Sequence, residues 1–269
     1  MQARIRELMK QGKIARLLGW KQDLVTKEAA PSLFCSPDEL SMLVPEGAAN
    51  LSKLLLTLPS GEGKTALLLK PCDGAGLSLL INEHRIKRET LYLIGLPCGG
   101  QKENGAFPQR CLVCARTDWS VECDETVDRA VPSLPRQDGS APVRELEQKT
   151  PQEKFSFWQG ELSKCIRCNA CRNACPACSC VQCIFDNDRS GVSSKVSSDS
   201  FEDQLYHIIR AFHVTGRCVE CGECDRVCPQ HIPLYLLHRK MSKDLREWYD
   251  EPTLTTFTPQ DREPEGGAQ

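Results

Sequence analysis

Two cysteine runs with one shared spacing constrain this chain more than any other feature of its sequence. Each run reads Cys-x2-Cys-x2-Cys-x3-Cys-Pro, and the runs begin at Cys165 and Cys218. Three thiolates placed two residues apart can hold three corners of one cubane cluster. The fourth thiolate, which follows after three intervening residues, is carried away by a turn and reaches a different cluster. The repeated spacing therefore predicts two 4Fe-4S clusters that exchange their fourth ligands.

This exchange divides the eight cysteines into two ligand sets. The first 4Fe-4S cluster is assigned to Cys165, Cys168, Cys171 and Cys228. The second is assigned to Cys218, Cys221, Cys224 and Cys175. Zinc is the alternative metal, but zinc sites usually consist of separated Cys-x2-Cys pairs and have no use for a ligand from a distant run.

The cysteine count also bears on the cellular compartment. The 269-residue chain has 17 cysteines, an odd number that argues against a framework of paired disulfides. Charged residues interrupt every apolar stretch near the N-terminus that could serve as a signal peptide, and no stretch approaches the length of a membrane span. We therefore expect a reduced, cytoplasmic protein without a membrane span. A net charge of -2 offers no electrostatic footprint for nucleic acid.

Residues 155–250 resemble two-cluster ferredoxin domains through these cysteine runs. They depart from compact ferredoxins in the 42 residues between Cys175 and Cys218, much of which has helical apolar spacing. In this respect the segment is similar to the α-helical ferredoxins of heterodisulfide reductase and fumarate reductase electron-transfer subunits. The resemblance implies a mainly helical dicluster ferredoxin-like domain that conducts electrons.

Two apolar stripes at helical spacing lie on either side of the second run, and we expect both to pack into the core of this domain. The first stripe comprises Phe201, Leu205, Ile208, Ile209 and Phe212. The second comprises Leu234, Leu237, Met241, Leu245 and Trp248. Their expected role is to bring the two cysteine runs together.

Residues 1–116 alternate helical and strand-like patterns, so the whole chain is predicted to be α+β, with a small N-terminal α/β domain before the helical one. An amphipathic helix beginning near Arg4 is expected to run into a strand near residues 15–20. A further helix is expected over residues 50–58. A strand, a helix and a strand then follow at residues 65–69, 73–83 and 91–96.

The remaining segments have compositions that do not build a core. Residues 117–154 combine prolines with serine, glycine and charged residues, which predicts a linker or an extended arm. Residues 251–269 contain prolines and glycines and are expected to form a flexible tail.

Four more cysteines form a second set in the N-terminal region. Cys72 and Cys98 each follow one of the expected strands, while Cys111 and Cys114 form a Cys-x2-Cys pair. Two thiols at the same end of neighbouring strands can close a tetrahedron with a nearby pair. A third 4Fe-4S cluster, a structural zinc ion and free thiols are the alternatives for this set.

The phrases around these cysteines are Lys-Pro-Cys-Asp at residues 70–73 and Gly-Leu-Pro-Cys-Gly-Gly at residues 95–100. They resemble the beta subunits of deazaflavin-coenzyme-reducing hydrogenases and formate dehydrogenases, where such cysteines hold a 4Fe-4S cluster. The resemblance implies a third 4Fe-4S cluster at Cys72, Cys98, Cys111 and Cys114. It also implies FAD as a further cofactor, although this chain continues into the ferredoxin region where that family often carries a flavin segment.

The other cysteines and the histidines show no complete site. Cys178, Cys180 and Cys183 directly follow the first run and could ligate an additional metal, serve as alternate ligands or pack beside the cluster. Cys35 and Cys123 are isolated and are expected to be small buried hydrophobes. The five histidines have no metal-binding spacing, and no catalytic nucleophile or paired-carboxylate site is evident. No catalytic residue is therefore predicted.

Charges differ between the two runs. Lys164, Arg167 and Arg172 flank the first run, whereas Glu220, Glu223 and Asp225 crowd the second. Because nearby positive charge favours the reduced and more negative cluster, the first cluster is predicted to have the higher reduction potential.

The motifs and resemblances together favour an iron-sulfur electron-transfer subunit that is not itself catalytic. Such a subunit relays electrons between a catalytic subunit and another redox module of an anaerobic oxidoreductase. The resemblances imply partners of the formate dehydrogenase, hydrogenase or heterodisulfide reductase type. Two alternatives stay open: a flavin-bearing beta subunit that itself reduces a soluble coenzyme, and a zinc-binding interaction module.

Overall fold

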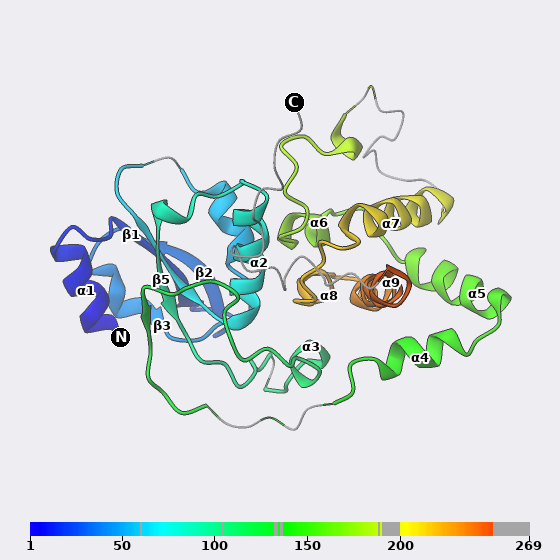
Figure 1. The fold of residues 1–269 in the computed structure, drawn as a ribbon, viewed down its shortest axis with the longest axis horizontal. Helices are drawn as coiled ribbons and strands as arrows, with labels where there is room; N and C mark the ends of the chain where they lie inside the picture. The colour runs from blue at the N-terminus through cyan, green and yellow to red at the C-terminus, as the bar shows by residue number, and fades with distance from the viewer. Residues whose placement is uncertain are drawn as a thin grey trace, which may run out of the picture. The chain divides into compact units, whose positions relative to one another are not determined.

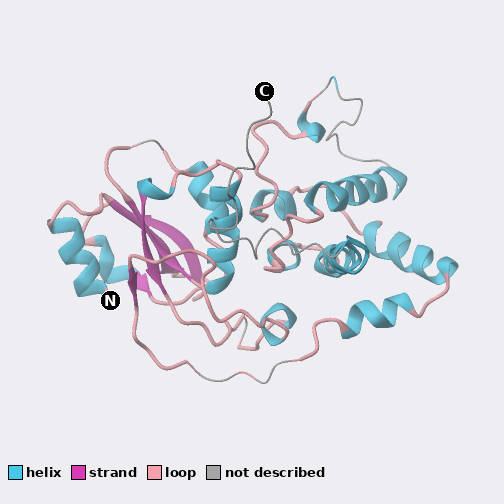
Figure 2. Ribbon diagram, viewed as in Figure 1, coloured by secondary structure: helices cyan, strands magenta, loops and turns pink. Residues whose placement is uncertain are grey.

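The computed structural model describes residues 1–59, 61–103, 105–131, 134, 137–187, 189 and 200–249. The described residues form two compact units, which divide between Gln137 and Asp138. The N-terminal unit is built around a β-sheet (Figure 1). The C-terminal unit consists of helices joined by loops (Figure 2). The α+β class predicted from the sequence is confirmed.

A mixed sheet forms the centre of the N-terminal unit. Its strands are β1 (Arg16–Gln22), β2 (Ala29–Phe34), β3 (Leu43–Val44), β4 (Thr65–Leu69), β5 (Leu91–Gly95) and β6 (Glu125–Thr126). The strand order is β2-β1-β4-β5-β6, and β3 also pairs with β1. β2 and β3 run antiparallel to β1, whereas β1, β4, β5 and β6 are parallel. All five residues of β4 are buried, as expected of a central parallel strand.

Helices complete the N-terminal unit. They are α1 (Gln2–Lys10), α2 (Pro71–Asn82) and α3 (Gln109–Leu112), with the 3-10 helices η1 (Glu39–Met42), η2 (Ser52–Thr57) and η3 (Arg88–Thr90). α2 connects the parallel strands β4 and β5 and therefore fulfils the predicted strand, helix, strand order. The helix expected over residues 50–58 is the 3-10 helix η2. Its start is held by the Asn50 side chain, which accepts a hydrogen bond from the Ser52 N–H.

The start of α2 is determined by two residues. Pro71 occupies the first helical position, where its missing N–H costs nothing. The Asp73 carboxylate accepts hydrogen bonds from the backbone N–H groups of Lys70 and Leu51. Because β4 and β5 are parallel neighbours, the segments that follow them leave the sheet at the same edge. This topology places the residues after β4 near those after β5.

The C-terminal unit is helical. Its elements are α4 (Ala141–Glu147), α5 (Pro151–Leu162), α6 (Ala170–Ala174), η4 (Ile184–Asp186), α7 (Ser200–Val214), α8 (Glu223–Arg226) and α9 (Leu234–Tyr249). α6 packs against α8, while α7 packs against α5 and α9. α9 also contacts α4 and α8. The two short helices α6 and α8 lie within the two cysteine runs, so their contact brings the runs together.

Residues 117–154, expected to be a linker or an extended arm, contain regular structure. The range includes β6, α4 and the first turn of α5. Thr150 and Glu153 form a reciprocal capping box at the start of α5, and Lys243 of α9 makes an ion pair with Glu147 of α4. These contacts order residues whose composition alone suggests an extended chain. The segment 251–269, expected to be a tail, lies outside the described residues.

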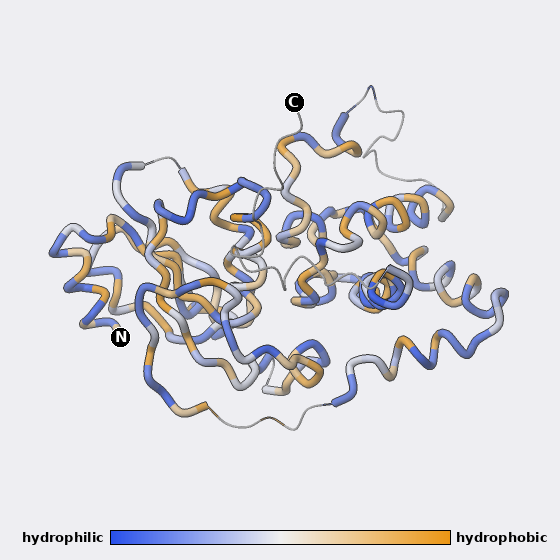
Figure 3. Tube along the Cα trace, viewed as in Figure 1, coloured by the Kyte–Doolittle hydropathy of each residue, from blue (hydrophilic) through white to orange (hydrophobic). Residues whose placement is uncertain are grey.

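The apolar stripe of α7 does not form a core, so this prediction was wrong. Phe201 and Phe212 are 69% and 64% exposed, and the alternation of apolar and polar residues along α7 can be followed in Figure 3. The buried face instead carries Tyr206, His207 and Arg210. The physical reason is that this face meets the first cysteine loop, whose polar backbone and side-chain groups need hydrogen-bonding partners.

The stripe of α9 is buried only at its start. Leu234 is 1% exposed, whereas Trp248 is 71% exposed. The intervening apolar residues of the stripe are half-buried. The expectation of core packing therefore holds for the first turn of α9, which contacts α8, and fails toward the end of the helix.

Candidate iron-sulfur centres

The two cysteine runs adopt the same backbone turn. In the first run Arg167 and Asn169 have left-handed φ angles of 53° and 60°. The matching positions of the second run, Glu220 and Gly222, have φ angles of 51° and 71°. Glycine and asparagine tolerate this conformation, but an arginine or a glutamate adopts it only where the surroundings impose it. The repeated spacing thus corresponds to a repeated loop conformation, which then enters α6 or α8.

The curled loops direct backbone N–H groups at cysteine sulfurs. In the first run the Arg167 N–H donates to Cys165 Sγ at 3.3 Å. In the second run the Glu220 N–H donates to Cys218, and the Glu223 N–H donates to Cys221. Such donors stabilise negative charge on sulfur. The loops are therefore suited to thiolates.

One cavity of the C-terminal unit brings together cysteines of both runs. It is lined by three cysteines of the first run and the last cysteine of the second: Cys165, Cys168, Cys171 and Cys228. Tyr206 and His207 of α7 also line it. These four cysteines are the set that the sequence assigns to the first cluster.

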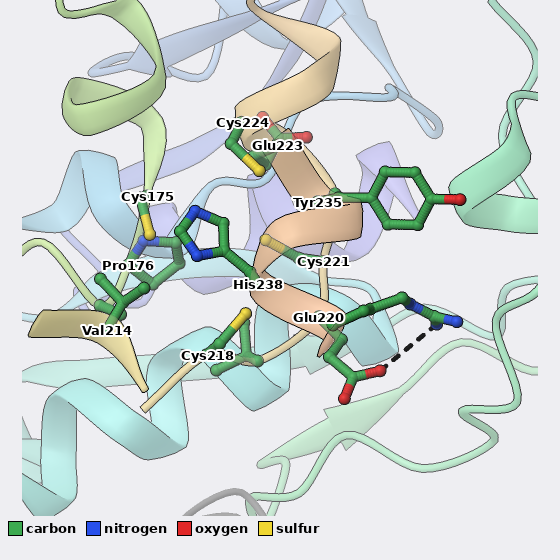
Figure 4. A pocket seen from close by; sticks show the side chains of 14 residues that line it. Cys175, Pro176, Val214, Cys218, Glu220, Cys221, Glu223, Cys224, Tyr235 and His238 are labelled. Atoms are coloured by element: carbon green, nitrogen blue, oxygen red, sulfur yellow. Dashed lines mark ion pairs between the residues drawn. The ribbon is translucent and has the colours of Figure 1, made fainter. Parts of the chain in front are cut away.

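A second cavity has the complementary composition. It is lined by three cysteines of the second run and the last cysteine of the first: Cys218, Cys221, Cys224 and Cys175. Figure 4 shows their sulfur atoms around the ring of His238, which reaches the cavity from α9. Across the described residues, no three histidine, cysteine or acidic side chains are arranged to hold a single metal ion.

Burial makes a negative charge costly on several of these thiols. Burial raises the pKa of Cys165 to about 11 and that of Cys218 to about 12, and it also raises the pKa of Cys171. Cys175 is the exception, because a hydrogen bond from the Cys178 thiol lowers its pKa to about 5. A thiol that ligates a metal is deprotonated outright, so a bound cluster would supply the stabilisation that burial removes.

Arg210 is the main buried cation near both cysteine sets. It is 3% exposed and donates to the backbone carbonyl of Cys171 at 3.1 Å. Its charge lowers the pKa of thiols from both sets, including Cys171 and Cys224. An Arg210 guanidinium in this position compensates negative charge in either cavity.

Ion pairs offset most of the charge difference that distinguishes the runs in the sequence. Near the first run, Arg172 pairs with Asp186 at 2.9 Å. Near the second run, Glu220 pairs with Arg246 at 3.0 Å and with Arg239 at 3.3 Å. Glu223 likewise pairs with Arg226 at 2.9 Å, and Arg167 lies 3.9 Å from Asp203. The sequence predicts that the first cluster has a higher reduction potential than the second because of these charged side chains. Since most of them are paired with opposite charges in the folded chain, we expect the difference between the two potentials to be small.

The N-terminal unit brings its own four cysteines together. Cys72 lies in the first turn of α2, Cys98 follows β5, Cys111 is in α3 and Cys114 follows it. Burial raises the pKa of Cys72, and the charges of Cys98 and Cys114 raise it further. Gln101 connects Cys111 with Cys98: its N–H donates to Cys111 Sγ at 3.5 Å, and its side-chain amide donates to Cys98 Sγ at 3.7 Å.

A buried ion pair supports the N-terminal set of four cysteines. Lys70 and Asp73, 2% and 0% exposed, flank Cys72 and form an ion pair at 2.8 Å. The Lys70 ammonium also lies 3.9 Å from the centre of the Trp20 ring and donates to the Ala49 carbonyl. Burial raises the pKa of Asp73, while the Lys70 charge and two backbone N–H donors oppose that rise. The pair fixes the first turn of α2 and with it the position of Cys72.

The five other cysteines have varied surroundings. Cys178 contacts Cys175 through their hydrogen bond, while Cys180 is exposed and Cys183 is half-buried. Cys123 is half-buried and packs against the core of the N-terminal unit, so the expectation of a buried hydrophobe holds there in part. Cys35 is exposed, so the expectation of a buried hydrophobe was wrong there. Cys35 directly follows the last residue of β2, and its backbone N–H donates to the Glu39 carboxylate, so it lies in the loop after the strand and not in the core.

Sequence reasoning overlooked the polar residues beside the cavities. Asp203, His207 and Arg210 recur at helical spacing on the buried face of α7, and His238 is buried on α9. The sequence does contain a pattern for these residues, because they form a polar stripe on the face of the helix opposite its apolar stripe. In most globular proteins such a polar stripe faces solvent, so the pattern alone does not point to burial.

Comparisons with known proteins bear on these sites. Residues 161–232 match the family model described as "4Fe-4S dicluster domain", a range that contains both cysteine runs. The chain is also similar to the F420-dependent formate dehydrogenase subunit beta of Methanocaldococcus jannaschii. The two are 23% identical over an alignment of 311 residues, which covers 80% of this chain and 77% of that protein.

Among the described helices, none has both the length and the apolar character needed to span a membrane.

The match to the dicluster family falls on the two cavities, and the wider similarity extends to the N-terminal unit. The chain is therefore an iron-sulfur protein with a dicluster ferredoxin domain at residues 161–232, and it is related to a formate dehydrogenase beta subunit.

Proposed function

We propose that this chain is an electron-transfer subunit that holds one 4Fe-4S cluster in each cavity of its C-terminal unit. The observation that carries this proposal is the lining of the two cavities, each with three cysteines from one run and the fourth from the other. The ligands are Cys165, Cys168, Cys171 and Cys228 for the first cluster, and Cys218, Cys221, Cys224 and Cys175 for the second. When bound, such clusters accept and donate single electrons.

The residues of the chain fit this role in three ways. The left-handed loop residues curl each run around its cavity, and backbone N–H groups donate to ligand sulfurs. Arg210 provides buried positive charge near both sets. Both features stabilise an anionic centre and raise its reduction potential.

We further propose a third 4Fe-4S cluster at Cys72, Cys98, Cys111 and Cys114. Four thiols from three segments meet there, and Gln101 donates to two of the sulfurs. The set provides four cysteine ligands without a further group from the chain. Three clusters would give the chain several relay stations for electrons.

The proposed partner is the catalytic subunit of a formate dehydrogenase complex in the cytoplasm. The similarity to a protein named as the beta subunit of such an enzyme supports this choice over a hydrogenase or a heterodisulfide reductase. A cytoplasmic complex agrees with the 17 cysteines, which a reducing compartment keeps available for metal ligation.

A second candidate is a flavin-bearing beta subunit that itself reduces a soluble coenzyme. It is favoured by the name of the same relative, which is described as F420-dependent. Purified protein would then retain a flavin absorption band through gel filtration. Absence of flavin in protein with a full complement of iron would leave the electron-transfer subunit as the function.

The deciding experiment is the measurement of iron, acid-labile sulfide, zinc and flavin per chain in anaerobically purified protein. Three 4Fe-4S clusters correspond to about twelve iron atoms and two clusters to about eight. The Cys35→Ala variant is the matched control, because Cys35 is exposed and belongs to none of the three proposed ligand sets. Zinc in place of iron, with no reversible reduction, would overturn the proposal in favour of a zinc-binding interaction module.

A further inference from the structure

A buried polar cluster on α7 and α9 connects the two cavities. His207 lines the first cavity and His238 lines the second, and their side chains are 2% and 4% exposed. Arg210 links His238 to the first cysteine loop, because it donates to the Cys171 carbonyl and approaches His238 Nε2 at 2.8 Å. Ionisable side chains this deeply buried need partners for their polar atoms.

The contact with Arg210 determines the state of the His238 ring. A guanidinium has only donors, so the ring nitrogen that faces it, Nε2, must be the acceptor. A ring nitrogen that accepts from a guanidinium carries no proton, so the ring is neutral. A neutral imidazole with a bare Nε2 carries its proton on Nδ1. His238 therefore presents an Nδ1–H donor.

That donor has no acceptor among the described residues. His238 Nδ1 is fully buried and makes no hydrogen bond to any of them. The ring nevertheless lies among the cysteines of the second cavity, as Figure 4 shows. A buried N–H without an acceptor is costly, and a sulfur centre bound in this cavity is the acceptor that the surroundings lack.

We propose that His238, oriented by Arg210, donates its Nδ1–H to the sulfur of the cluster held by Cys218, Cys221, Cys224 and Cys175. The inference rests on the proposed function, because it requires a cluster in that cavity. Arg210 acts as a positioning residue, since it selects the tautomer without itself reaching into the cavity. The His238 N–H stabilises the reduced cluster and so raises its reduction potential, in opposition to the acidic residues of the second run.

The first test uses the unaltered holoprotein. Histidine labelled with ¹⁵N is incorporated, the protein is partly reduced, and pulsed EPR records magnetic couplings between cluster electrons and nearby nuclei. We expect a ¹⁵N coupling and an exchangeable-proton coupling in the signal of the second cluster. The His238→Leu variant loses both couplings, while the His207→Leu variant retains them. A second-cluster signal without histidine coupling in the unaltered protein overturns the inference.

The second test measures the reduction potentials of both clusters by redox-titrated EPR. His238→Leu is expected to shift the reduction equilibrium of the second cluster about tenfold toward the oxidised form, which is about 59 mV for a one-electron couple. His238→Gln, which keeps an amide donor, recovers part of the shift. His213→Leu is the matched control, because His213 is exposed on α7.

The outcomes distinguish a failure of the proposed function from a failure of the His238 inference. Protein without iron would remove the proposed function itself. Protein with eight or more iron atoms whose second-cluster potential is unchanged in His238→Leu would remove only this inference. Equal shifts of both potentials would also overturn it, because a donor to one cluster acts mainly on that cluster.

Discussion

The two cysteine-rich regions of this chain assemble their sites in different ways. In the C-terminal unit, six of the eight proposed ligands are grouped by local spacing, and only the contact between α6 and α8 is needed to exchange the other two. In the N-terminal unit, the ligands come from three segments that only the sheet brings to one edge. The comparison teaches that ligands grouped by sequence spacing stay together with little help from the fold. Ligands that meet across a sheet stay together only while the surrounding fold is intact.

The largest expected effect is the selective loss of clusters. Cys221→Ala should remove about four iron atoms with the EPR signal of the second cluster, because each 4Fe-4S cluster contains four. Cys98→Ala should remove the third cluster instead and leave both signals of the C-terminal unit, since the two units are separately compact. Iron analysis and EPR of each variant check this. Loss of all clusters in Cys98→Ala would contradict the independence of the two regions.

The second prediction concerns the dependence of the N-terminal site on its fold. Asp73→Asn leaves the Lys70 ammonium buried without its carboxylate partner, which is expected to cost about 3–5 kcal/mol. The urea midpoint reported by circular dichroism should fall, and the iron of the third cluster should be lost first. Asp138→Asn is the control, because Asp138 pairs with Arg144 at the surface. An unchanged midpoint in Asp73→Asn would show that the ion pair does not support the site.

A smaller effect is expected from the charges around the second run. Glu220→Gln removes a carboxylate that offsets Arg239 and Arg246, and so it should raise the second-cluster potential. The expected shift is less than tenfold in the reduction equilibrium, or less than about 59 mV. Redox-titrated EPR measures it, with the exposed Glu145→Gln as the control. A lowered potential would refute this electrostatic account.

The smallest expected effect concerns the exposed stripe of α7. Phe212→Ser should change the free energy of unfolding by no more than about 0.5 kcal/mol, because Phe212 is 64% exposed. Leu234→Ala, at a position 1% exposed, should cost about 2–5 kcal/mol. Urea unfolding followed by circular dichroism compares the two variants. Equal losses would mean that the stripe of α7 is core, as its spacing alone predicts.

Much of the fold could be predicted from particular residues. The apolar run of β4 lies at the residues expected, because a strand buried on both faces must be apolar throughout. The helix between β4 and β5 was also predicted, from apolar spacing over residues 73–83, and in the structure it begins two residues earlier at Pro71. The 3-10 form of η2 could not be predicted, because the difference between helix types depends on packing and not on apolar spacing.

The buried face of α7 shows where sequence reasoning reached its limit. Phe201 and Phe212 have the spacing of a core stripe, yet Arg210 and His207 are the residues that are buried. Burial of a cation is unfavourable unless an acceptor is present, and the Cys171 carbonyl and His238 Nε2 become acceptors only after the chain has folded. Contacts between residues this far apart in the chain have no counterpart in local periodicity.

The sequence by itself determined the chemistry of the dicluster region, because the spacing of cysteines within each run is covalent and survives in any fold. It also predicted which fourth cysteine belongs with which run, from the three residues that stand before Cys175 and before Cys228. Only the tertiary structure decided what surrounds those thiols: the paired state of Glu220, the burial of Arg210 and the orientation of His238. The reason is that charge compensation and hydrogen bonding depend on distances between distant residues, which folding alone establishes.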